Sequence, residues 1–84
     1  MTAIIKHPIS NEKAIRLMES ENKLVFAVDI KATKTEIKDA IAKMFDAKVV
    51  SVNTKISPDG KKSAFIRFND DTPAIDIATN LGLI

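Results

Sequence analysis

One stretch near the middle of the chain, residues 23–56, constrains the fold most strongly. Apolar residues recur there at every second position, namely Leu24, Phe26, Val28 and Ile30. The residues between them include Val25 and Ala27, so both faces of the strand are largely apolar. A strand of this kind is covered on both sides. We therefore expect residues 23–31 to form a central strand of a sheet.

A helix with a clear start follows this strand. Thr33 and Glu36 have the spacing of a capping box, in which each side chain binds a free backbone N–H group. Apolar residues then recur at helical spacing, and residues 48–56 return to the alternating pattern of a strand. The residues concerned are Ile37, Ala40, Ile41, Met44 and Phe45 in the helix, and Val50, Val52 and Ile56 in the strand. A central apolar strand with a crossover helix predicts a sheet with helices on both faces.

Turn and cap residues indicate the elements before this stretch. We expect a short strand at residues 2–6 that ends before Pro8, because proline disfavours a regular continuation. Ser10 or Asn11 is expected to cap a helix that runs to about Ser20, and Asn22 to end it in the left-handed conformation. The apolar side of this helix is Ala14, Ile15, Leu17 and Met18.

The end of the chain predicts a hairpin and a last helix. Pro58 and Gly60 lie in a turn sequence, since proline fixes φ and glycine accepts a positive φ, so residues 48–68 form a hairpin. The last helix is expected to start at residues 71–73, with Gly82 as its C-cap. Its inner residues are Ile77, Ala78 and Leu81, and the expected core of the protein is Leu24, Phe26, Val28, Ile37, Ile41, Val52 and Ile66. The order β-α-β-α-β-β-α predicts a single α+β domain over residues 1–84.

Charge is unevenly distributed along the chain. Residues 1–68 hold all 13 lysines and arginines together with 8 acidic residues, whereas residues 69–84 hold three aspartates and no basic residue. A basic bias fits a polyanionic partner but is also common on solvated surfaces. The chain has no cysteine, no apolar stretch of membrane-spanning length and no signal-peptide pattern, which makes the cytoplasm the expected location.

The residues needed for catalysis are sparse. His7 is the only histidine and has no cysteine or second histidine beside it, so we expect no metal site and no cofactor. Asp70 and Asp71 could act as an acid–base pair, but adjacent acids before a Thr-Pro pair are usually caps and turn formers. The two glycines do not form a phosphate-binding loop. The sequence predicts a protein that is not an enzyme.

The basic hairpin is the strongest candidate site. Basic and amide side chains gather along it around Phe65, namely Asn53, Lys55, Lys61, Lys62 and Arg67. Phosphate-binding cations with an aromatic ring are a usual combination for RNA. The alternative is an edge strand protected by solvated lysines, with Phe65 in a second core layer. The pattern alone leaves both interpretations open.

Collinear sequence blocks extend over nearly the whole chain, namely residues 7–14, 22–28, 32–38, 45–54, 61–67 and 77–82. Through these blocks the chain resembles the universal large-subunit ribosomal protein family twenty-three, and its end is similar to archaeal members. Val52-Asn53-Thr54 followed by the basic hairpin is the most specific of them. Ser63 stands where a basic residue is usual and Phe68 where leucine is usual, and the turn at residues 57–61 is shorter than the tunnel loop of bacterial members.

The resemblance implies a four-stranded antiparallel sheet in a three-layer α/β/α arrangement. It also implies a structural protein of the large subunit that binds rRNA as a monomer beside the exit of the nascent-chain tunnel, in contact with neighbouring ribosomal proteins. The expected RNA-binding residues are His7, Lys13, Lys34, Asn53, Lys55, Lys61, Lys62 and Arg67. Glu12 and Asp46 match acidic positions at which family members receive targeting factors, which implies docking of the GTPase subunit of the signal recognition particle. The alternative is that Glu12 only favours its helix dipole and that Asp46 only ends its helix.

Two other classes of function compete with this interpretation. A free-standing RNA- or protein-binding module would share the composition and the sheet without needing the collinear pattern. A small phosphate-ester hydrolase would need an arginine-bearing, glycine-rich loop after the first strand, and residues 6–10 contain neither arginine nor glycine.

Overall fold

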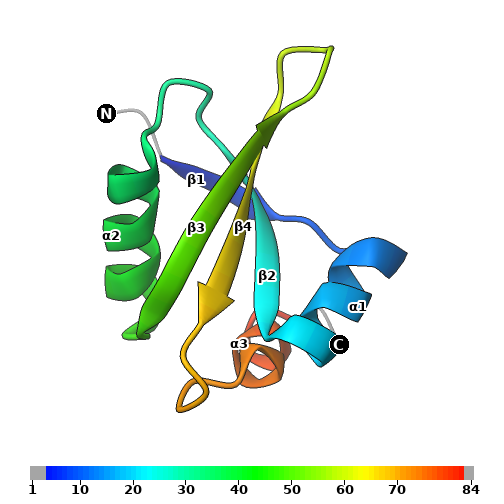
Figure 1. Cartoon of the computed structure of the whole chain (residues 1–84), viewed down its shortest axis with the longest axis vertical. Helices are drawn as coiled ribbons and strands as arrows, with labels where there is room; N and C mark the ends of the chain where they lie inside the picture. Colours follow the sequence, from blue (N-terminus) through cyan, green and yellow to red (C-terminus); the bar gives the residue numbers. More distant parts are fainter. Residues whose placement is uncertain (1–3, 83–84) are drawn as a thin grey trace.

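The computed structural model of the chain describes residues 4–82. Within them, the elements follow one another in the predicted order β-α-β-α-β-β-α, an α+β fold (Figure 1). In chain order they are β1 (Ile5–Pro8), α1 (Glu12–Glu21), β2 (Lys23–Val28), α2 (Lys34–Phe45), β3 (Val49–Ile56), β4 (Lys62–Phe68) and α3 (Ala74–Asn80).

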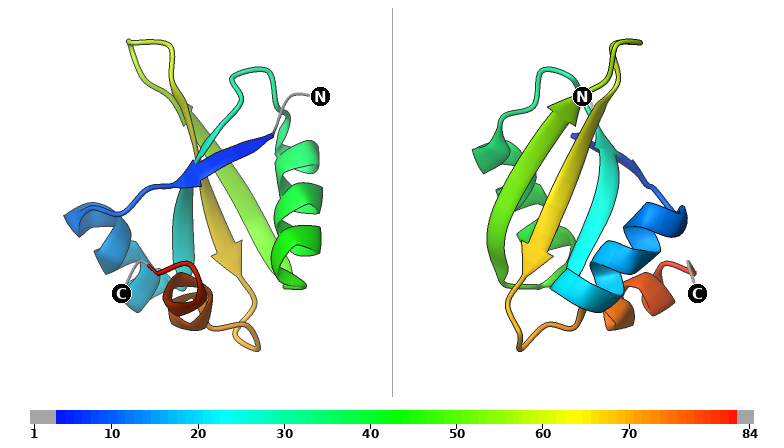
Figure 2. Two further views of the ribbon diagram at one scale, coloured as in Figure 1. Left: turned by 180° about the vertical axis from the view of Figure 1, so that it is seen from behind. Right: turned by 45° about the vertical axis from the view of Figure 1, so that its right-hand side comes forward.

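The strands form one antiparallel sheet in the order β1-β2-β4-β3. β2 and β4 lie side by side in its centre, so the apolar strand predicted to be central is central. In the right-hand view of Figure 2, α2 lies behind the strands, whereas α1 lies in front of the start of β2. Helices therefore lie on both faces of the sheet, which confirms the predicted three-layer arrangement.

The main core lies between the sheet and the helices α2 and α3. Its largest fully buried side chains come from β2, α2 and β4, namely Phe26, Phe68, Ile37, Ile41, Ile66 and Val28. Ala74, Ile77 and Ala78 of α3 belong to the same cluster. Every residue predicted for the core is buried except Val52, which is half-buried and packs against the cluster from β3, a strand at the edge of the sheet.

The local start and stop signals were predicted correctly for the first two helices. The Asn11 side chain accepts a hydrogen bond from the Ala14 N–H at 2.8 Å and caps α1. Thr33 and Glu36 form the predicted capping box of α2, with N···O distances of 3.2 and 3.0 Å. These bonds satisfy N–H groups that lack partners within their own helix, which explains why the helices start there.

Five apolar residues that the pattern placed inside are exposed: Ile15, Ile30, Met44, Val50 and Ile56. β2 ends at Val28, and the chain turns there because the Asp29 carboxylate accepts the Lys31 N–H at 2.9 Å, so Ile30 leaves the strand. A bulge between Val49 and Ser51 turns Val50 outward. Such irregularities change which face a side chain occupies without changing the apolar pattern in the sequence.

The first strand is shifted relative to its prediction. Residues 2 and 3 of the predicted strand lie outside the described residues, and β1 runs from Ile5 through Pro8. Pro8 therefore belongs to the strand that it was expected to terminate. A strand at the edge of a sheet accepts proline because one side of its backbone needs no hydrogen-bond donor, and β1 lies at such an edge.

Asn22 joins three segments that are distant in the sequence. It ends α1 in the predicted left-handed conformation, with φ of 56°. Its side-chain amide lies within hydrogen-bond distance of three carbonyl oxygens between β4 and α3. The acceptors are Phe68 at 3.1 Å, Asn69 at 3.2 Å and Thr72 at 3.1 Å. The residue that stops one helix therefore also holds the connection to another.

The same side chain caps α3. Pro73 precedes that helix and makes no side-chain capping bond, and Asp71 and Thr72 do not cap it either, contrary to the prediction. Instead, the Asn22 side-chain oxygen accepts the Ala74 N–H at 2.6 Å. The cap comes from a residue remote in the sequence, so no local motif could reveal it. Gly82 has the positive φ expected after a helix end, one residue beyond the observed C-cap, Leu81.

Candidate nucleic-acid interface

The face of the sheet opposite α2 and α3, called the outer face here, carries polar and basic side chains. Paired residues of antiparallel neighbours point to the same side. Asn53 pairs with Phe65, Lys55 with Ser63, and Ser51 with Arg67. Lys23 of β2 also pairs with Arg67. Asn53, Lys55 and Arg67 therefore gather on one face around Phe65, as the sequence predicts.

Lys13 completes this group from α1. Its ammonium nitrogen lies 5.8 Å from the centre of the Phe65 ring, within the range of a cation–π contact. The ring is half-buried and lies outside the buried core cluster. Phe65 belongs to the central strand β4 and pairs with the buried Val25 of β2, whereas β3, the other strand of the hairpin, lies at the edge of the sheet. The RNA-binding hypothesis and the alternative of a lysine-protected edge strand both stay predictions.

The two adjacent hairpin lysines have different surroundings. Lys62 pairs with Val28 and Ile56, and its ammonium donates to the Ala32 carbonyl at 2.6 Å. Lys61 is exposed, and its ammonium lies 4.0 Å from the Asp59 carboxylate. Lys62 therefore ties the hairpin to the segment that leads into α2, whereas Lys61 faces solvent.

Asp59 is engaged within the turn that carries Lys61. Its carboxylate accepts hydrogen bonds from the Ser57 hydroxyl and from the Lys61 backbone N–H. The Ser57 hydroxyl, followed by that N–H, lowers the pKa of Asp59 because both donors favour the charged form. The carboxylate is thus committed to holding the turn.

One groove is lined both by His7 and by residues of the hairpin. It lies between β1, the end of β2 and residues 57–63, and its volume is about 380 Å³. His7, Lys61 and Lys62 line it together with Lys6, which sequence reasoning did not single out. His7 and Lys13 were expected to share a contact near the first helix, yet His7 lines this groove while Lys13 lies over Phe65. We call this cavity the hairpin groove.

Three further candidate residues lie away from the outer face. Lys34 is the first residue of α2, on the layer behind the sheet. Glu12 begins α1, where it is exposed and lies 3.5 Å from the Arg16 guanidinium. Asp46 ends α2 with a φ of 50°. Figure 1 shows α1 and α2 on opposite flanks, so the two acidic residues do not form one continuous surface.

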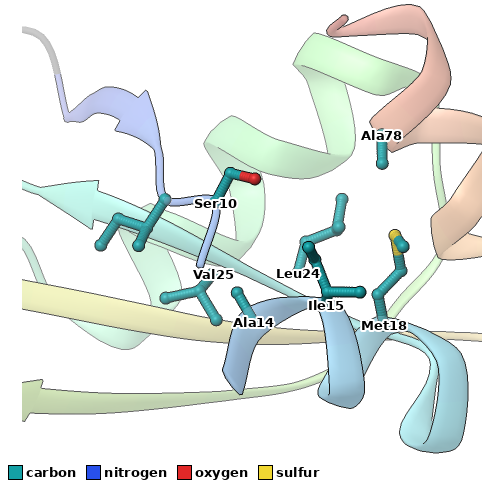
Figure 3. Close-up of a pocket in the computed structure, with 8 residues that line it drawn as sticks. Ser10, Ala14, Ile15, Met18, Leu24, Val25 and Ala78 are labelled. Carbon is teal, nitrogen blue, oxygen red and sulfur yellow. The ribbon is translucent and has the colours of Figure 1, made fainter. Parts of the chain in front are cut away.

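An apolar pocket between α1, β2 and α3 is too small for a ligand. Figure 3 shows Ala14, Ile15 and Met18 of α1 facing Leu24, with Ala78 of α3 across the gap. Its volume of about 20 Å³ is close to that of a single water site. The basic outer face and the hairpin groove are therefore the surfaces suited to a ligand.

The described part of the chain also bears on metal sites and membrane spans. Over residues 4–82, no three His, Asp or Glu side chains gather as a metal site would require. None of the helices in that range is long and apolar enough to cross a membrane.

Lys23 is the outer-face cation that sequence reasoning missed. Its ammonium lies 3.4 Å from the Glu21 carboxylate. Its position at the start of β2, opposite Arg67, was not apparent because the two paired residues lie more than forty positions apart in the sequence. The register of β2 against β4 is the information that would have identified Lys23 as part of the outer face.

Comparison with known proteins agrees with the geometry. Residues 3–78 match the family model described as Ribosomal protein L23. The chain is 50% identical over 80 residues to the large ribosomal subunit protein uL23 of Methanococcus aeolicus, an alignment that covers 95% of this chain and 93% of the relative. The corresponding protein of Methanococcus vannielii is 49% identical over the same shares of the two chains. The chain therefore belongs to the ribosomal protein L23 family.

Proposed function

We propose that the chain binds large-subunit rRNA through its outer face and stands near the exit of the nascent-chain tunnel. Membership of the family makes it a structural protein of the large ribosomal subunit, within the ribosome of the cytoplasm, and the family is of a non-enzymatic kind. The observation that carries the proposed binding mode is the Lys13–Phe65 contact on a sheet face that also bears Lys55 and Arg67.

This arrangement suits RNA for two physical reasons. Lysine and arginine neutralise phosphates, which supplies affinity without sequence preference. An aromatic ring on an open sheet offers a surface on which an unpaired base can stack. The Asn53 amide, paired with Phe65, can donate to or accept from a base edge beside that ring. A free-standing RNA-binding module would use the same face, so the family relation is what assigns it to rRNA.

The outer-face cations should set the salt dependence of binding. Replacing Lys55 and Arg67 together with alanine is expected to make the slope of log affinity against log salt shallower by about 1.4–1.8, because two phosphate contacts are lost. The measurement is fluorescence anisotropy with transcribed archaeal large-subunit rRNA at several salt concentrations.

A matched control variant has the same net charge as the Lys55 and Arg67 double variant. Lys38 and Lys43 are exposed residues of α2, on the opposite layer, and their double alanine variant should retain the wild-type slope. Equal slopes for the two double variants would show that rRNA does not bind the outer face.

Single alanine variants of the two hairpin lysines should differ in their effects on rRNA binding and on stability. Lys61→Ala is expected to reduce the salt slope by about 0.7–0.9 and leave the melting temperature unchanged, since the side chain is exposed. Lys62→Ala should lower the melting temperature by several degrees, because a charged hydrogen bond to the Ala32 carbonyl contributes about 1.5–3 kcal/mol. If Lys62→Ala melts like the wild type, that bond does not hold the hairpin.

The finer proposal concerns targeting factors. An exposed carboxylate on the α1 flank could steer a basic partner electrostatically, here the GTPase subunit of the signal recognition particle. Because Glu12 and Asp46 lie on opposite flanks, they are best tested as two single variants. A docking surface on the α1 flank predicts that Glu12→Lys weakens particle binding to ribosomes while Asp46→Lys does not.

Both charge reversals should leave incorporation into the subunit unchanged, which sucrose-gradient sedimentation measures. Loss of incorporation for Glu12→Lys would place that residue against RNA instead. Unchanged particle binding for Glu12→Lys would place the docking surface elsewhere.

A further inference from the structure

The hairpin groove has the size and the mixed chemistry of a ligand site. Its volume of about 380 Å³ falls within the usual range for small-molecule pockets, whereas the apolar pocket between α1 and α3 holds about 20 Å³. Three separate segments form it: β1 with the chain just after it, the end of β2 with the following turn, and the hairpin. Only tertiary packing assembles this groove.

Its lining combines polar and apolar side chains. Lys6, His7 and Lys61 supply cationic or hydrogen-bonding groups, and Ser57 supplies a hydroxyl. Ala27 and Ile30 supply apolar surface. The lining contains no carboxylate, and nearby Asp59 is held by the Ser57 hydroxyl and by the Lys61 backbone N–H. A fitting ligand therefore combines an anionic group with a weakly polar part that can contact apolar side chains.

Ile30 supports this inference independently. The residue is 45% exposed, although the sequence places it in phase with the buried residues of β2. It sits in the turn after the strand, where it fills no space in the core cluster, and it lines the hairpin groove. An apolar side chain at the wall of a lysine-lined cavity offers contact area to a base.

We propose that the hairpin groove holds a single unstacked nucleotide of rRNA, with its base against Ala27 and Ile30 and its phosphate between Lys6 and Lys61. The inference rests on the proposed function and adds one ligand site to it. RNA is recognised largely through unpaired bases that leave the stack, and such a base needs an apolar wall with a phosphate site beside it. A cavity of this volume exceeds the needs of a phosphate alone.

Mononucleotides provide the first test with the full chain. Adenosine, guanosine, cytidine and uridine 5′-monophosphates would be titrated separately while methyl and amide NMR signals are followed. At least one should shift the Ala27 and Ile30 methyl signals with millimolar saturation, whereas inorganic phosphate should leave those methyl signals in place. The proposal is overturned if no mononucleotide moves them, or if phosphate alone reproduces the whole pattern.

A variant of Ile30 provides the second test, with a control of similar exposure. Ile30→Ala should weaken binding of large-subunit rRNA about threefold to tenfold at fixed salt, because apolar contact is lost. Its salt slope should not change, because no charge is removed. Ile75 of α3 is 48% exposed and lies outside the groove lining, so Ile75→Ala should bind like the wild type.

Different results would exclude rRNA binding at the outer face and nucleotide binding in the hairpin groove. If the Lys55 and Arg67 variant retains the wild-type slope, the outer face is not the rRNA-binding surface. If that variant behaves as expected but Ile30→Ala binds like the wild type, only the nucleotide site is wrong. Melting temperatures of Ile30→Ala and Ile75→Ala within a few degrees of the wild type would confirm that affinity, and not folding, is being compared.

Discussion

Replacing Phe26 with alanine is expected to lower the free energy of unfolding by about 3–5 kcal/mol, as for other buried aromatic residues. Phe26 is 1% exposed in the centre of β2, and its ring centroid lies 5.9 Å from that of Phe45 in α2. Truncation would leave a cavity between the sheet and α2 that a close-packed core cannot fill by small movements. Urea denaturation followed by circular dichroism measures the change.

Met44 provides the control for this prediction. It lies one position before Phe45 but is 55% exposed, so Met44→Ala should change the free energy of unfolding by less than about 0.5 kcal/mol. A Phe26→Ala variant that unfolds within a few tenths of a kcal/mol of the wild type would contradict the observed phase of β2. The loss of about 3–5 kcal/mol that we expect for Phe26→Ala is a substantial part of the total stability of a domain of this size.

Asn22 should be the most sensitive polar residue of the described chain. Asn22→Ala is expected to cost about 2–4 kcal/mol, for two reasons. Its side chain serves three carbonyl groups and the Ala74 N–H, which would lose their partner where they are partly buried. Alanine is also less tolerant than asparagine of the φ of 56° at this position.

Substitution of Asn22 with glycine separates the effect of the lost hydrogen bonds from that of the backbone conformation. Asn22→Gly removes the side-chain hydrogen bonds but tolerates the left-handed conformation, so it should be more stable than Asn22→Ala by about 1 kcal/mol. Amide hydrogen exchange provides a local readout, because both variants should lose protection at the start of α3. Wild-type exchange rates in α3 would mean that Asn22 acts only as the stop of α1.

Part of the candidate nucleic-acid interface could be predicted from the sequence, because it lies on a sheet. Asn53, Lys55 and Arg67 were predicted to gather around Phe65, and the observed register places them there. That result follows from the period of two along each strand, combined with a turn whose residues define where the hairpin closes. The cation over the Phe65 ring comes from α1, and hairpin patterning could not predict which lysine would supply it.

Local interactions determined where the first two helices start and where the first of them ends. The Asn11 cap, the capping box at Thr33 and the left-handed stop at Asn22 each involve groups a few residues apart, so they can be recognised without knowledge of the fold. The positive φ of Gly60 in the hairpin turn belongs to the same class. The alternating pattern of β2 likewise revealed its central position, because both of its faces are apolar over adjacent residues.

Tertiary structure decided the surroundings of several other side chains. The end of β2 at Val28 moved Ile30 from the expected core to the hairpin groove. Lys61 and Lys62 are adjacent in the sequence, yet Lys62 binds the Ala32 carbonyl and Lys61 is exposed. Where a strand ends or bulges is settled by its pairing with distant strands, and one residue of shift moves a side chain to the other face.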